Sequence, residues 1–370
     1  MNFETLLDNP ADWMQSRGPY SEIVLTSRVR LARNVGQTSF PGWASKSERK
    51  RILGDILPAV NGLEEMSDAF SEELENLSSI KKQVLVERHL ISREHAARSG
   101  GSAAVMNANQ SVSIMINEED HLRMQSIEPG LNLEEAYGAI DSVDSRLEEA
   151  LDYAFDSQLG YLTACPTNLG TGMRASVMLH LPALVLTEQV NKVVQAVNKI
   201  GLAVRGLYGE GTEALGNLFQ VSNQNTLGEK EDEIIARLER VVGQIINNEQ
   251  NARQMLLEDK PNTLFDQIGR AYAILRHSYI ITSKEALNLL SVLRLAVDLE
   301  CLPSEARESV DILLMQIQPA HLQIRAKTKL SAEKRDSLRA EIMRDQLKTL
   351  PEPDIFSLKR KGEASDNDDQ

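Results

Sequence analysis

The sequence contains little that could cross-link the chain or stack on nucleic-acid bases. Its 370 residues include only two cysteines, Cys165 and Cys301, so no disulfide framework is predicted and a reducing compartment such as the cytoplasm is expected. Aromatic residues make up 4% of the chain, which argues against a base-stacking surface for single-stranded nucleic acid. The net charge of −14 argues against general binding of polyanions. We therefore expect no nucleic-acid partner.

Long apolar runs and the common phosphate-binding motifs are also missing. No segment approaches the ~20 apolar residues of a membrane span, and the acidic start of the chain (Glu4, Asp8, Asp12) does not resemble a signal peptide. We therefore expect no membrane partner. The chain has neither a GxxxxGK[ST] loop nor the HRD and DFG signatures of hydroxyl-directed protein kinases. If this protein is an enzyme that uses ATP, it must bind the phosphates with a different set of residues.

The pattern of apolar residues changes along the chain. Up to residue 228 predicted strands alternate with predicted helices, and beyond it the pattern is helical almost throughout. The length allows two domains, residues 258–263 are predicted to be a linker, and the polar stretch 351–370 is predicted to be disordered. The predicted strands are 23–31, 84–86, 112–116 and 218–221, and the predicted helices are 1–17, 47–57, 64–77, 133–155, 231–257, 286–299 and 338–347.

Residues 165–174, Cys-Pro-Thr-Asn-Leu-Gly-Thr-Gly-Met-Arg, are the most informative segment. They place the Cys165 thiol and the Arg174 guanidinium at opposite ends of a glycine-rich turn, in which backbone N–H groups can approach an anion closely. A helix that begins after Gly172, together with nearby arginines, would lower the pKa of the thiol. A cysteine on its own, however, is more often a small buried hydrophobe than a nucleophile.

Two further segments carry charged residues at informative spacing. In the predicted strand 23–31, period two places Arg28 and Arg30 on one face, although such a pair alone is more often a solvated strand face. Residues 117–123, Asn-Glu-Glu-Asp-His-Leu-Arg, combine three carboxylates with an arginine, which alone could be a charge run at the end of a loop. Phosphoryl transfer from ATP to a guanidine needs both kinds of residue, because arginines neutralise the phosphates and a carboxylate deprotonates the guanidinium.

These segments occur together, and they follow one another along the chain in the same order as the corresponding motifs of one known family. Residues 26–30, 117–123, 165–174 and 205–211 resemble motifs of the phosphagen (guanidino) kinases. The resemblance implies an α+β fold: an antiparallel β-sheet flanked by helices, glutamine-synthetase-like, followed by a small all-helical C-terminal domain. We predict a catalytic domain over residues 1–257, a helical domain for phosphoarginine binding and dimerisation over residues 258–350, and a tail over residues 351–370.

The resemblance also implies roles for individual residues. Glu119 is the base toward the guanidinium, and Cys165 and Glu210 are the other catalytic residues. Glu118, Glu119 and Glu210 bind the guanidinium. His89 faces the adenine of ATP, and the phosphates are held by five arginines, Arg28, Arg30, Arg123, Arg174 and Arg205. Magnesium accompanies ATP, held mostly by phosphates and water, and no separate metal site is expected.

Further details resemble the bacterial protein-arginine kinases within this family. Phosphagen kinases carry a helical domain before the catalytic region, whereas the motif at 26–30 stands close to the start of this sequence. The expected consequence is an open site that accepts an arginine on a polypeptide. Residues 335–340, Arg-Asp-Ser-Leu-Arg-Ala, resemble a phosphoarginine-binding motif, which implies allosteric binding by Arg335, Asp336 and Arg339. Without the resemblance, a charged surface helix is the simpler interpretation.

The predicted function is therefore phosphorylation of arginine side chains in proteins at the expense of ATP. The resemblance further implies a homodimer, a zinc-binding activator of the McsA type, and delivery of marked proteins to a Clp chaperone-protease in protein quality control and stress response. Two alternatives stay open: a kinase for free arginine, and a catalytically idle adaptor that binds phosphoarginine. Retention of Glu119, Cys165, Glu210 and all five arginines argues against the adaptor.

Overall fold

The computed structural model describes residues 1–15, 17–206 and 214–354. These residues form two compact units. The first comprises residues 1–178, 197–203 and 221–242, and the second contains the rest of the described chain. Both units take residues from before and after position 200, so this division follows packing rather than the order of the chain. The predicted domain boundary at residue 257 stays a prediction.

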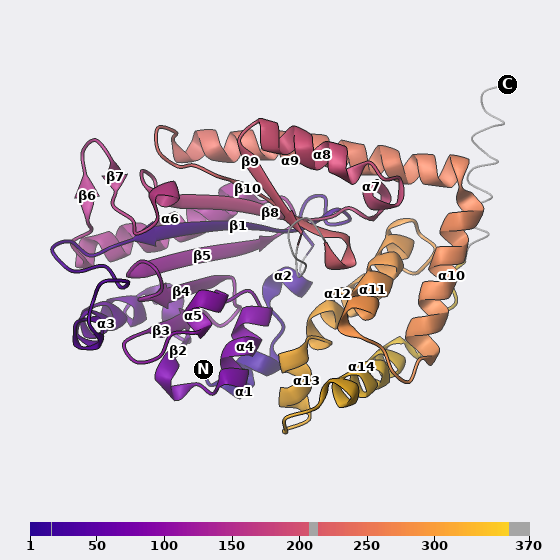
Figure 1. Cartoon of the computed structure of the whole chain (residues 1–370), viewed down its shortest axis with the longest axis horizontal. Coiled ribbons are helices and arrows are strands. Elements are labelled where there is room, and N and C mark those ends of the chain that lie inside the picture. The colour runs from indigo at the N-terminus through magenta and orange to yellow at the C-terminus, as the bar shows by residue number, and fades with distance from the viewer. Residues whose placement is uncertain (16, 207–213, 355–370) are drawn as a thin grey trace. The chain divides into compact units, whose positions relative to one another are not determined.

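One eight-stranded sheet runs through the described chain (Figure 1), and its strands carry Arg28, Arg30, Arg123, Arg174 and Arg205. Strands β2, β3, β4, β5 and β1 follow one another by antiparallel pairing, and β8, β10 and β9 complete the sheet. Two short strands form a separate hairpin. In sheet order the strands are β2 (Phe70–Glu73), β3 (Ala103–Met106), β4 (Val112–Ile116), β5 (Leu122–Pro129), β1 (Val24–Arg33), β8 (Met173–His180), β10 (Leu218–Asn223) and β9 (Leu202–Gly206), and the hairpin is β6 (Phe155–Asp156) with β7 (Gly160–Tyr161).

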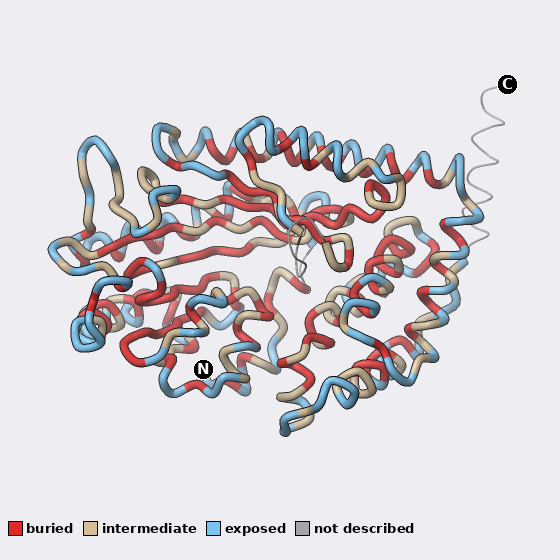
Figure 2. The backbone as a smooth tube through the Cα atoms, in the orientation of Figure 1, coloured by how far each residue is buried: buried red, intermediate tan, exposed pale blue. Residues whose placement is uncertain are grey.

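Helices flank the sheet in the first unit. α6 packs against β1 and β5, and α3 packs against β3 and β4. Figure 2 shows that β1, β4 and β5 run mostly through buried positions, so the core lies along this sheet. The helices up to residue 170 are α1 (Phe3–Asp8), α2 (Asp12–Gln15), α3 (Lys46–Asn61), α4 (Ser79–Glu87), α5 (Arg93–Ala96) and α6 (Leu133–Ala150), with 3-10 turns η1 (Glu64–Met66), η2 (Leu74–Asn76) and η3 (Pro166–Asn168).

The rest of the described chain is mainly helical, and the predicted α+β class with a helical C-terminal region is confirmed. Among the C-terminal helices, α10 packs against α11 and α14, and α12 packs against α11, α13 and α14. These elements are α7 (Pro182–Leu186), α8 (Val190–Lys199), η4 (Leu215–Asn217), α9 (Glu231–Asp259), α10 (Pro261–His277), α11 (Ser283–Asp298), α12 (Ala306–Gln316), α13 (Pro319–Arg325) and α14 (Ala332–Leu347). Across the described residues, no helix has an apolar stretch of the length that a bilayer crossing needs.

Two of the predicted elements in the first unit are wrong. The apolar triplet at 84–86, predicted as a strand, lies inside α4, where Ser78 caps the helix by accepting a hydrogen bond from the backbone N–H of Lys81. The acidic stretch 64–77, predicted as a helix, contains η1, the edge strand β2 and η2. Pairing of β2 with β3 buries Phe70, and this tertiary contact overrides the local helical pattern.

The predicted linker at 258–263 is a junction between two helices. α9 ends at Asp259, and Pro261 occupies the first position of α10, where its missing N–H group would have no helical partner in any case. Only Lys260 separates the two helices. Of the predicted tail, residues 355–370 lie outside the described residues.

A buried ion pair fastens β1 to α6. Arg33 donates to Oδ2 of Asp144 from Nε at 3.0 Å and from Nη2 at 2.6 Å. Its Nη1 donates to the carbonyl oxygens of Ala32 and Thr171, each at 2.9 Å, and its guanidinium lies 3.5 Å from the ring centre of Tyr161. One side chain therefore joins the end of β1, helix α6 and the glycine-rich segment.

We predict that Asp144→Ala lowers the free energy of unfolding by about 3–5 kcal/mol, because it leaves the buried Arg33 guanidinium without its carboxylate. Arg146→Ala on the same helix is the matched control. Its ion pair with Glu65 is partly exposed, so the expected loss is below about 1 kcal/mol. Urea denaturation of both variants measures the difference, and equal losses would contradict this role for the buried pair.

Candidate active site

Three neighbouring strands bring four of the predicted phosphate-binding arginines together. Arg28 and Arg30 lie two residues apart on β1, and Arg123 and Arg174 are the second residues of β5 and β8. β1 lies between β5 and β8, and its register places Ala32 opposite Arg123. Burial, followed by the charges of Arg123 and Arg174, lowers the pKa of Arg28 to about 10. The four guanidinium groups, here called the arginine cluster, are therefore close enough to repel one another.

Arg30 shows the electrostatic cost of this arrangement. Burial lowers its pKa well below the usual value, and the charges of Arg28, Arg123 and Arg174 lower it further, while Glu118 acts in the opposite direction. Its Nε atom is buried and has no hydrogen-bond partner among the described residues. A group of desolvated positive charges with an unused donor fits a ligand that carries several negative charges, as nucleotide phosphates do.

Glu118 is the carboxylate that partly neutralises the arginine cluster. It is 1% exposed and accepts from Nη1 of Arg123 at 2.8 and 3.0 Å, from the hydroxyl of Ser92, and from the backbone N–H of Glu119 at 3.2 Å. Burial raises the pKa of Glu118, but Arg123 and these hydrogen bonds outweigh burial, so the pKa lies below its usual value. Glu118 therefore holds Arg123 in place, and its contact with a guanidinium substrate stays a prediction.

Glu119 differs from the preceding residue because it is exposed. Desolvation, followed by the charges of Asp120 and Glu118, raises its pKa. The turn that presents it begins at Asn117, which has a left-handed φ of 58° and whose side chain donates to two backbone carbonyls. An accessible carboxylate with a raised pKa is suited to accept a proton from a substrate N–H group.

Cys165 is half-buried and precedes the turn η3, with its Sγ 3.1 Å from Oγ1 of Thr167. The helix predicted after Gly172 is wrong, because the residues that follow are nearly all buried in the sheet as β8. The predicted effect of a helix terminus on the thiol is therefore removed. Gly172 has a φ of +67°, and a Cβ atom there would lie 2.6 Å from the carbonyl oxygen of Ala32, so the entry into β8 requires glycine.

His89 lies on the turn after α4 with a left-handed φ of 60°. Burial, followed by the charge of Arg28, lowers its pKa to about 3, so the imidazole is neutral at pH 7. Its ring packs against Trp13 of α2 with the centroids 6.2 Å apart, and its carbonyl accepts from Nε2 of Gln125 at 2.6 Å. His89 thus lies beside the arginine cluster, and its contact with adenine stays a prediction.

Two predicted site residues lie outside the described part of the first unit. Arg205 is exposed on β9, in a segment that belongs to the second compact unit. Glu210 lies outside the described residues. The roles of both residues stay predictions.

Sequence reasoning missed Ser92, which supports Glu118. Ser92 caps α5 by accepting from the backbone N–H of His95 at 2.9 Å, while its hydroxyl donates to Glu118. A serine at the start of a short helix is a recognisable cap signal. Nothing local, however, connects it with a glutamate 26 residues later. Only the folded sheet brings the two together.

The three predicted phosphoarginine-binding residues all lie on α14, but they differ in how far they are buried. Arg335 and Asp336 are half-buried, whereas Arg339 is 1% exposed. Arg339 donates to the carbonyl oxygens of Ile317 at 3.1 Å and Ile281 at 2.8 Å, and to Oδ1 of Asp336 at 2.5 Å. Arg339 is therefore committed to holding the segments before α11 and α13 against α14, and it also engages Oδ1 of Asp336. Binding of phosphoarginine by Arg335, Asp336 and Arg339 stays a prediction.

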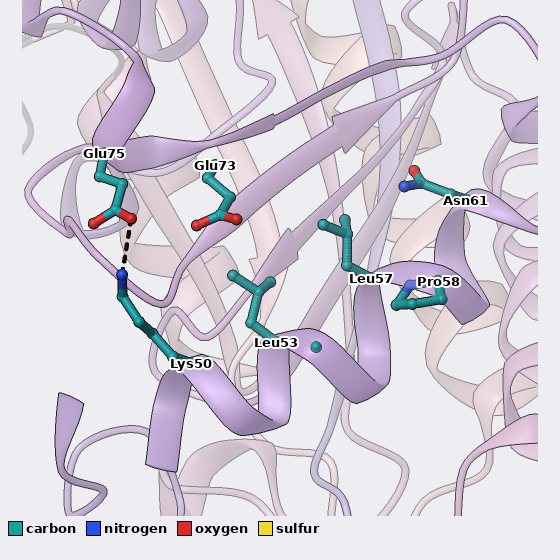
Figure 3. A pocket seen from close by; sticks show the side chains of 8 residues that line it. Lys50, Leu53, Leu57, Pro58, Asn61, Glu73 and Glu75 are labelled. Carbon is teal, nitrogen blue, oxygen red and sulfur yellow. Dashed lines mark hydrogen bonds and ion pairs between the residues drawn. The ribbon is translucent and has the colours of Figure 1, made fainter. Parts of the chain in front are cut away.

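A pocket of about 530 Å³ lies elsewhere in the first unit, between α3 and the segment around β2 (Figure 3). It combines apolar side chains with an ion pair of 3.0 Å between Lys50 and Glu75. Its lining residues are Lys50, Leu53, Gly54, Leu57, Pro58, Asn61, Glu73 and Glu75. Because no predicted site residue lines this pocket, we place the candidate active site at the arginine cluster.

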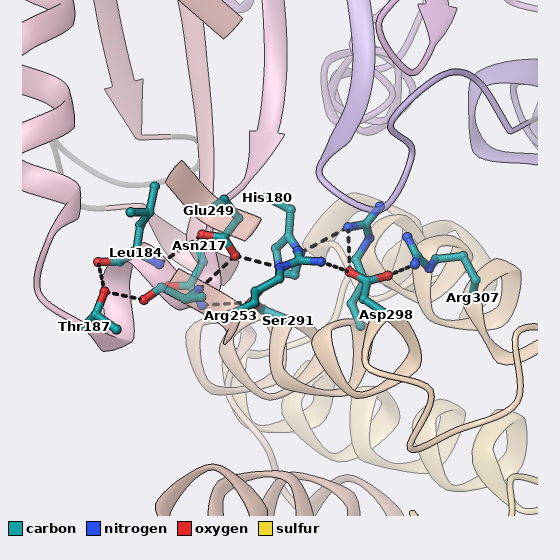
Figure 4. Close-up of polar contacts among 11 residues, drawn as sticks. His180, Leu184, Thr187, Asn217, Glu249, Arg253, Ser291, Asp298 and Arg307 are labelled. Atoms are coloured by element: carbon teal, nitrogen blue, oxygen red, sulfur yellow. Dashed lines mark hydrogen bonds and ion pairs between the residues drawn. The ribbon is translucent and has the colours of Figure 1, made fainter. Parts of the chain in front are cut away.

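A second cluster of buried charges lies in the second unit (Figure 4). Asp298 lies 3.2 Å from Arg253 and 4.0 Å from Arg294, and it also contacts Arg307. Arg253 pairs in turn with Glu249 at 3.0 Å, and Glu249 accepts from two backbone N–H groups at the start of α7. Arg294 also pairs with Asp311 at 2.8 Å, so three carboxylates balance the three arginines of this cluster. The cluster therefore stabilises the fold and offers no excess of charge to a ligand.

His180 connects the end of β8 to this second cluster. Nη1 of Arg294 donates to Nδ1 of His180 at 3.1 Å, so Nδ1 carries no proton and Nε2 donates to Oγ of Ser291 at 2.7 Å. Burial, followed by the charge of Arg294, lowers the pKa of His180 well below its usual value. The imidazole is therefore neutral and fixed in one tautomer.

Comparison with known families identifies the family to which the chain belongs. The profile of the ATP:guanido phosphotransferase C-terminal catalytic domain matches residues 55–252. The profile of the protein-arginine kinase McsB C-terminal domain matches residues 261–358. The chain belongs to the ATP:guanido phosphotransferase family. The resemblance inferred from the motifs is confirmed.

Several relatives of this guanido phosphotransferase carry the name protein-arginine kinase. The protein from Halothermothrix orenii is 44% identical over 348 residues, which cover 94% of this chain and 99% of that protein. The protein from Shouchella clausii is 46% identical over 351 residues, with coverage of 94% and 98%. The protein from Halalkalibacterium halodurans is 48% identical over 339 residues, with coverage of 91% and 95%.

Solved structures share the fold of this guanido phosphotransferase at lower identity. The crystal structure of a lombricine kinase has a TM-score of 0.55 at 24% identity, and the match covers 65% of this chain and 74% of that chain. The duplicated taurocyamine kinase from Schistosoma mansoni, with bound transition-state-analogue components, has a TM-score of 0.57 at 24% identity, with coverage of 70% and 39%. Both support the α+β fold.

We predict that Arg30→Met weakens ATP binding about 10- to 100-fold, through the loss of charge-assisted hydrogen bonds. The nucleotide-free protein should be as stable as wild type or more stable, because the substitution removes a desolvated charge beside three others and keeps an apolar stem. Calorimetry of ATP binding and thermal unfolding test both expectations. Arg51→Ala, which removes an exposed arginine of α3, is the control and should change neither quantity. A destabilised variant with unchanged ATP affinity would show that Arg30 stabilises the fold and does not bind ATP.

We predict that Glu119→Gln keeps ATP binding and loses phosphoryl transfer by about 10²- to 10⁴-fold, the usual effect of removing a general base. The matched control is Glu94→Gln, which removes a neighbouring exposed carboxylate whose charge also raises the pKa of Glu119. The control should retain turnover. Near wild-type turnover in Glu119→Gln would exclude the base assignment.

The same pair of variants yields a pH test. A base with a raised pKa holds its proton to higher pH, so activity should fall on acidification through a pKa above the usual value of 4.5. Removing the Glu94 charge lowers the pKa of Glu119 and should move this acid limb to lower pH. A pH profile of kcat/KM measures the shift.

Proposed function

We propose that this protein transfers the γ-phosphoryl group of ATP to the guanidinium groups of arginine side chains in proteins. The observation that carries the proposal is the arginine cluster beside the accessible carboxylate of Glu119, whose pKa is raised above its usual value. Positive charge for the phosphates and a base for the guanidinium are the two requirements of this reaction. Family membership, and relatives named protein-arginine kinase, support the choice of acceptor.

In the proposed mechanism the arginine cluster binds ATP and stabilises the charge of the transferring group. ATP enters with Mg²⁺, which is held mostly by phosphate oxygens and water. Arg28, Arg30, Arg123 and Arg174 already stand together before ATP arrives, so little reorganisation is needed during transfer. Arg205 completes the set in this proposal. Bound phosphate also relieves the mutual repulsion of the cluster, which favours binding of a polyanion over a neutral ligand.

Glu119 is the proposed base. A guanidinium has a pKa above about 12, so the carboxylate does not deprotonate it in the ground state. The proton instead moves to Glu119 as the guanidinium nitrogen bonds to the γ-phosphorus and the bond from that phosphorus to the β–γ bridging oxygen breaks. ADP leaves with the bridging oxygen, and Glu119 then passes the proton to solvent. In this proposal Cys165, Glu118 and Glu210 hold the guanidinium in line for attack.

Two alternatives use parts of the same site. A kinase for free arginine needs the same charges and base and differs only in the acceptor. An idle adaptor would need neither, and the described residues keep Glu119, Cys165 and four arginines in one unit, which disfavours it. From the family resemblance we also propose a homodimer, an activator of the McsA type, delivery of marked proteins to a Clp protease, and action in the cytoplasm.

The direct test is incubation of the enzyme with ATP and an unfolded protein, followed by mass spectrometry under conditions that preserve acid-labile phosphoarginine. We expect phosphate on arginine and ADP release that is much faster with the protein than with free arginine. The matched control is the same unfolded protein with its arginines blocked by a dicarbonyl reagent. Comparable efficiency with free arginine would favour the small-molecule kinase, and no transfer to either acceptor would favour the adaptor.

We further propose that Arg335 and Asp336 bind phosphoarginine on proteins, with the guanidinium of Arg335 facing the phosphate and the carboxylate of Asp336 facing the substrate guanidinium. Their partial exposure on α14 supports this pair, in contrast to Arg339. If the bound state is the active one, product binding and activity are linked reciprocally.

We predict that Arg335→Ala weakens binding of a phosphoarginine peptide about 10- to 100-fold, since one charge-assisted hydrogen bond contributes about 1.5–3 kcal/mol. Basal turnover should remain. Lys334→Ala, which removes the neighbouring exposed cation, should bind the peptide as wild type does. Calorimetry measures the affinity of each protein for the peptide. Equal affinities in wild type and both variants would favour the interpretation of this segment as a charged surface helix.

A further inference from the structure

Asn34 and Asp120 connect the two reactive segments of the site. Asn34 directly follows β1 and is 1% exposed, and Asp120 follows Glu119 and is 2% exposed. Nδ2 of Asn34 donates to Oδ1 of Asp120 at 2.6 Å. Both Nδ2 hydrogens and Oδ1 of Asn34, and Oδ1 of Asp120, are occupied by partners within the protein, so the effect of this pair on the site passes through the residues that they hold.

The side chain of Asn34 uses every hydrogen-bonding group that it has. Its second Nδ2 hydrogen goes to the carbonyl oxygen of Leu162 at 3.0 Å, and its Oδ1 accepts from the backbone N–H of His121 at 2.9 Å. One amide therefore ties together the end of β1, the acidic turn 117–121 and the segment that leads to Cys165. A saturated polar group at a buried position fixes the geometry of its neighbours, because any displacement leaves a partner unsatisfied.

Asp120 extends this connection to the reactive thiol. Its Oδ1 also accepts from the backbone N–H of Ala164 at 2.6 Å. Glu119 immediately precedes Asp120, and Cys165 immediately follows Ala164. A single carboxylate oxygen is thus the shared acceptor between the two segments that carry the proposed base and the thiol.

The other end of the thiol segment is also held. The hydroxyl of Thr226 donates to the carbonyl oxygen of Leu169 at 2.6 Å. With Ala164 fixed at one end and Leu169 at the other, the turn around Cys165 has little freedom to shift against Glu119. The ATP side has different supports, since Arg123 is held by Glu118 and Ser92 stabilises that carboxylate.

We propose that the Asn34–Asp120 pair is a positioning element that sets the placement of Cys165 relative to Glu119 around the acceptor guanidinium. This inference rests on the proposed function. Neither residue touches the reacting atoms, and the pair acts on the acceptor side of the site rather than on ATP. Loss of this pair should therefore lower turnover and leave ATP affinity unchanged. A general loss of stability would lower both.

The test is Asn34→Ala in a Cys301→Ser background, in which thiol alkylation reports Cys165 alone. ATP affinity should stay unchanged, turnover with an unfolded protein should fall about 100-fold, the scale of a ~1 Å misplacement, and iodoacetamide should alkylate Cys165 faster because the turn is released. The matched control is Asn107→Ala, which removes two side-chain hydrogen bonds, against three for Asn34→Ala, at the turn between β3 and β4. If Asn34→Ala equals this control in turnover and alkylation rate, the inference is overturned.

A second pair of variants separates position from charge. Asp120→Asn keeps an oxygen that can accept from Asn34 and Ala164, so it should retain most of the turnover, whereas Asp120→Ala should lose it as Asn34→Ala does. Equal losses in both variants would show that the carboxylate charge itself is required, which contradicts a positioning role. An inactive wild-type protein would count against the proposed function, and the alkylation rates would still decide whether the pair positions Cys165.

Discussion

Mutual repulsion among four guanidinium groups is the constraint on which the rest of the first unit depends. Buried like charges are unfavourable, and the fold accommodates them only with support from elsewhere. Glu118 offsets part of the charge and is itself held by Ser92 and Arg123. The Arg33–Asp144 ion pair holds β1, the strand that carries Arg28 and Arg30, against α6. In the proposed function this arrangement is preorganised for a polyanion, at the expense of stability in its absence.

The charged cluster around Asp298 in the second unit differs because its positive charges are paired with carboxylates. It contains two buried arginines, Arg253 and Arg294, and the half-buried Arg307, and each of them has a carboxylate within 4.0 Å. Glu249 also accepts from two backbone N–H groups. The two clusters contain similar residues and differ in balance. An excess of one charge distinguishes the arginine cluster from this balanced network, and such an excess is what an anionic ligand requires. Composition alone does not separate them.

The sequence predicted the strands at 23–31, 112–116 and 218–221, because alternation and short apolar runs are local signals that the sheet does not override. It failed at 84–86 and 64–77, where a serine cap and pairing with β3 decide the outcome. The same distinction holds for the site. Motifs identified Arg28 and Glu119, whereas the pairing of Glu118 with Arg123 and the burial of Arg339 depend on strand register and helix packing, which no local pattern encodes.

Three consecutive carboxylates show how far position, rather than residue type, determines chemistry here. Glu118 is buried against Arg123 and has a lowered pKa, Glu119 is exposed with a raised pKa, and Asp120 is buried as an acceptor for Asn34 and Ala164. The turn aims them in different directions, so adjacent letters of one motif support the nucleotide side, the proposed proton transfer and the thiol segment. Glu118 and Glu119 are the same amino acid, so the difference between them comes only from the partners that each position provides.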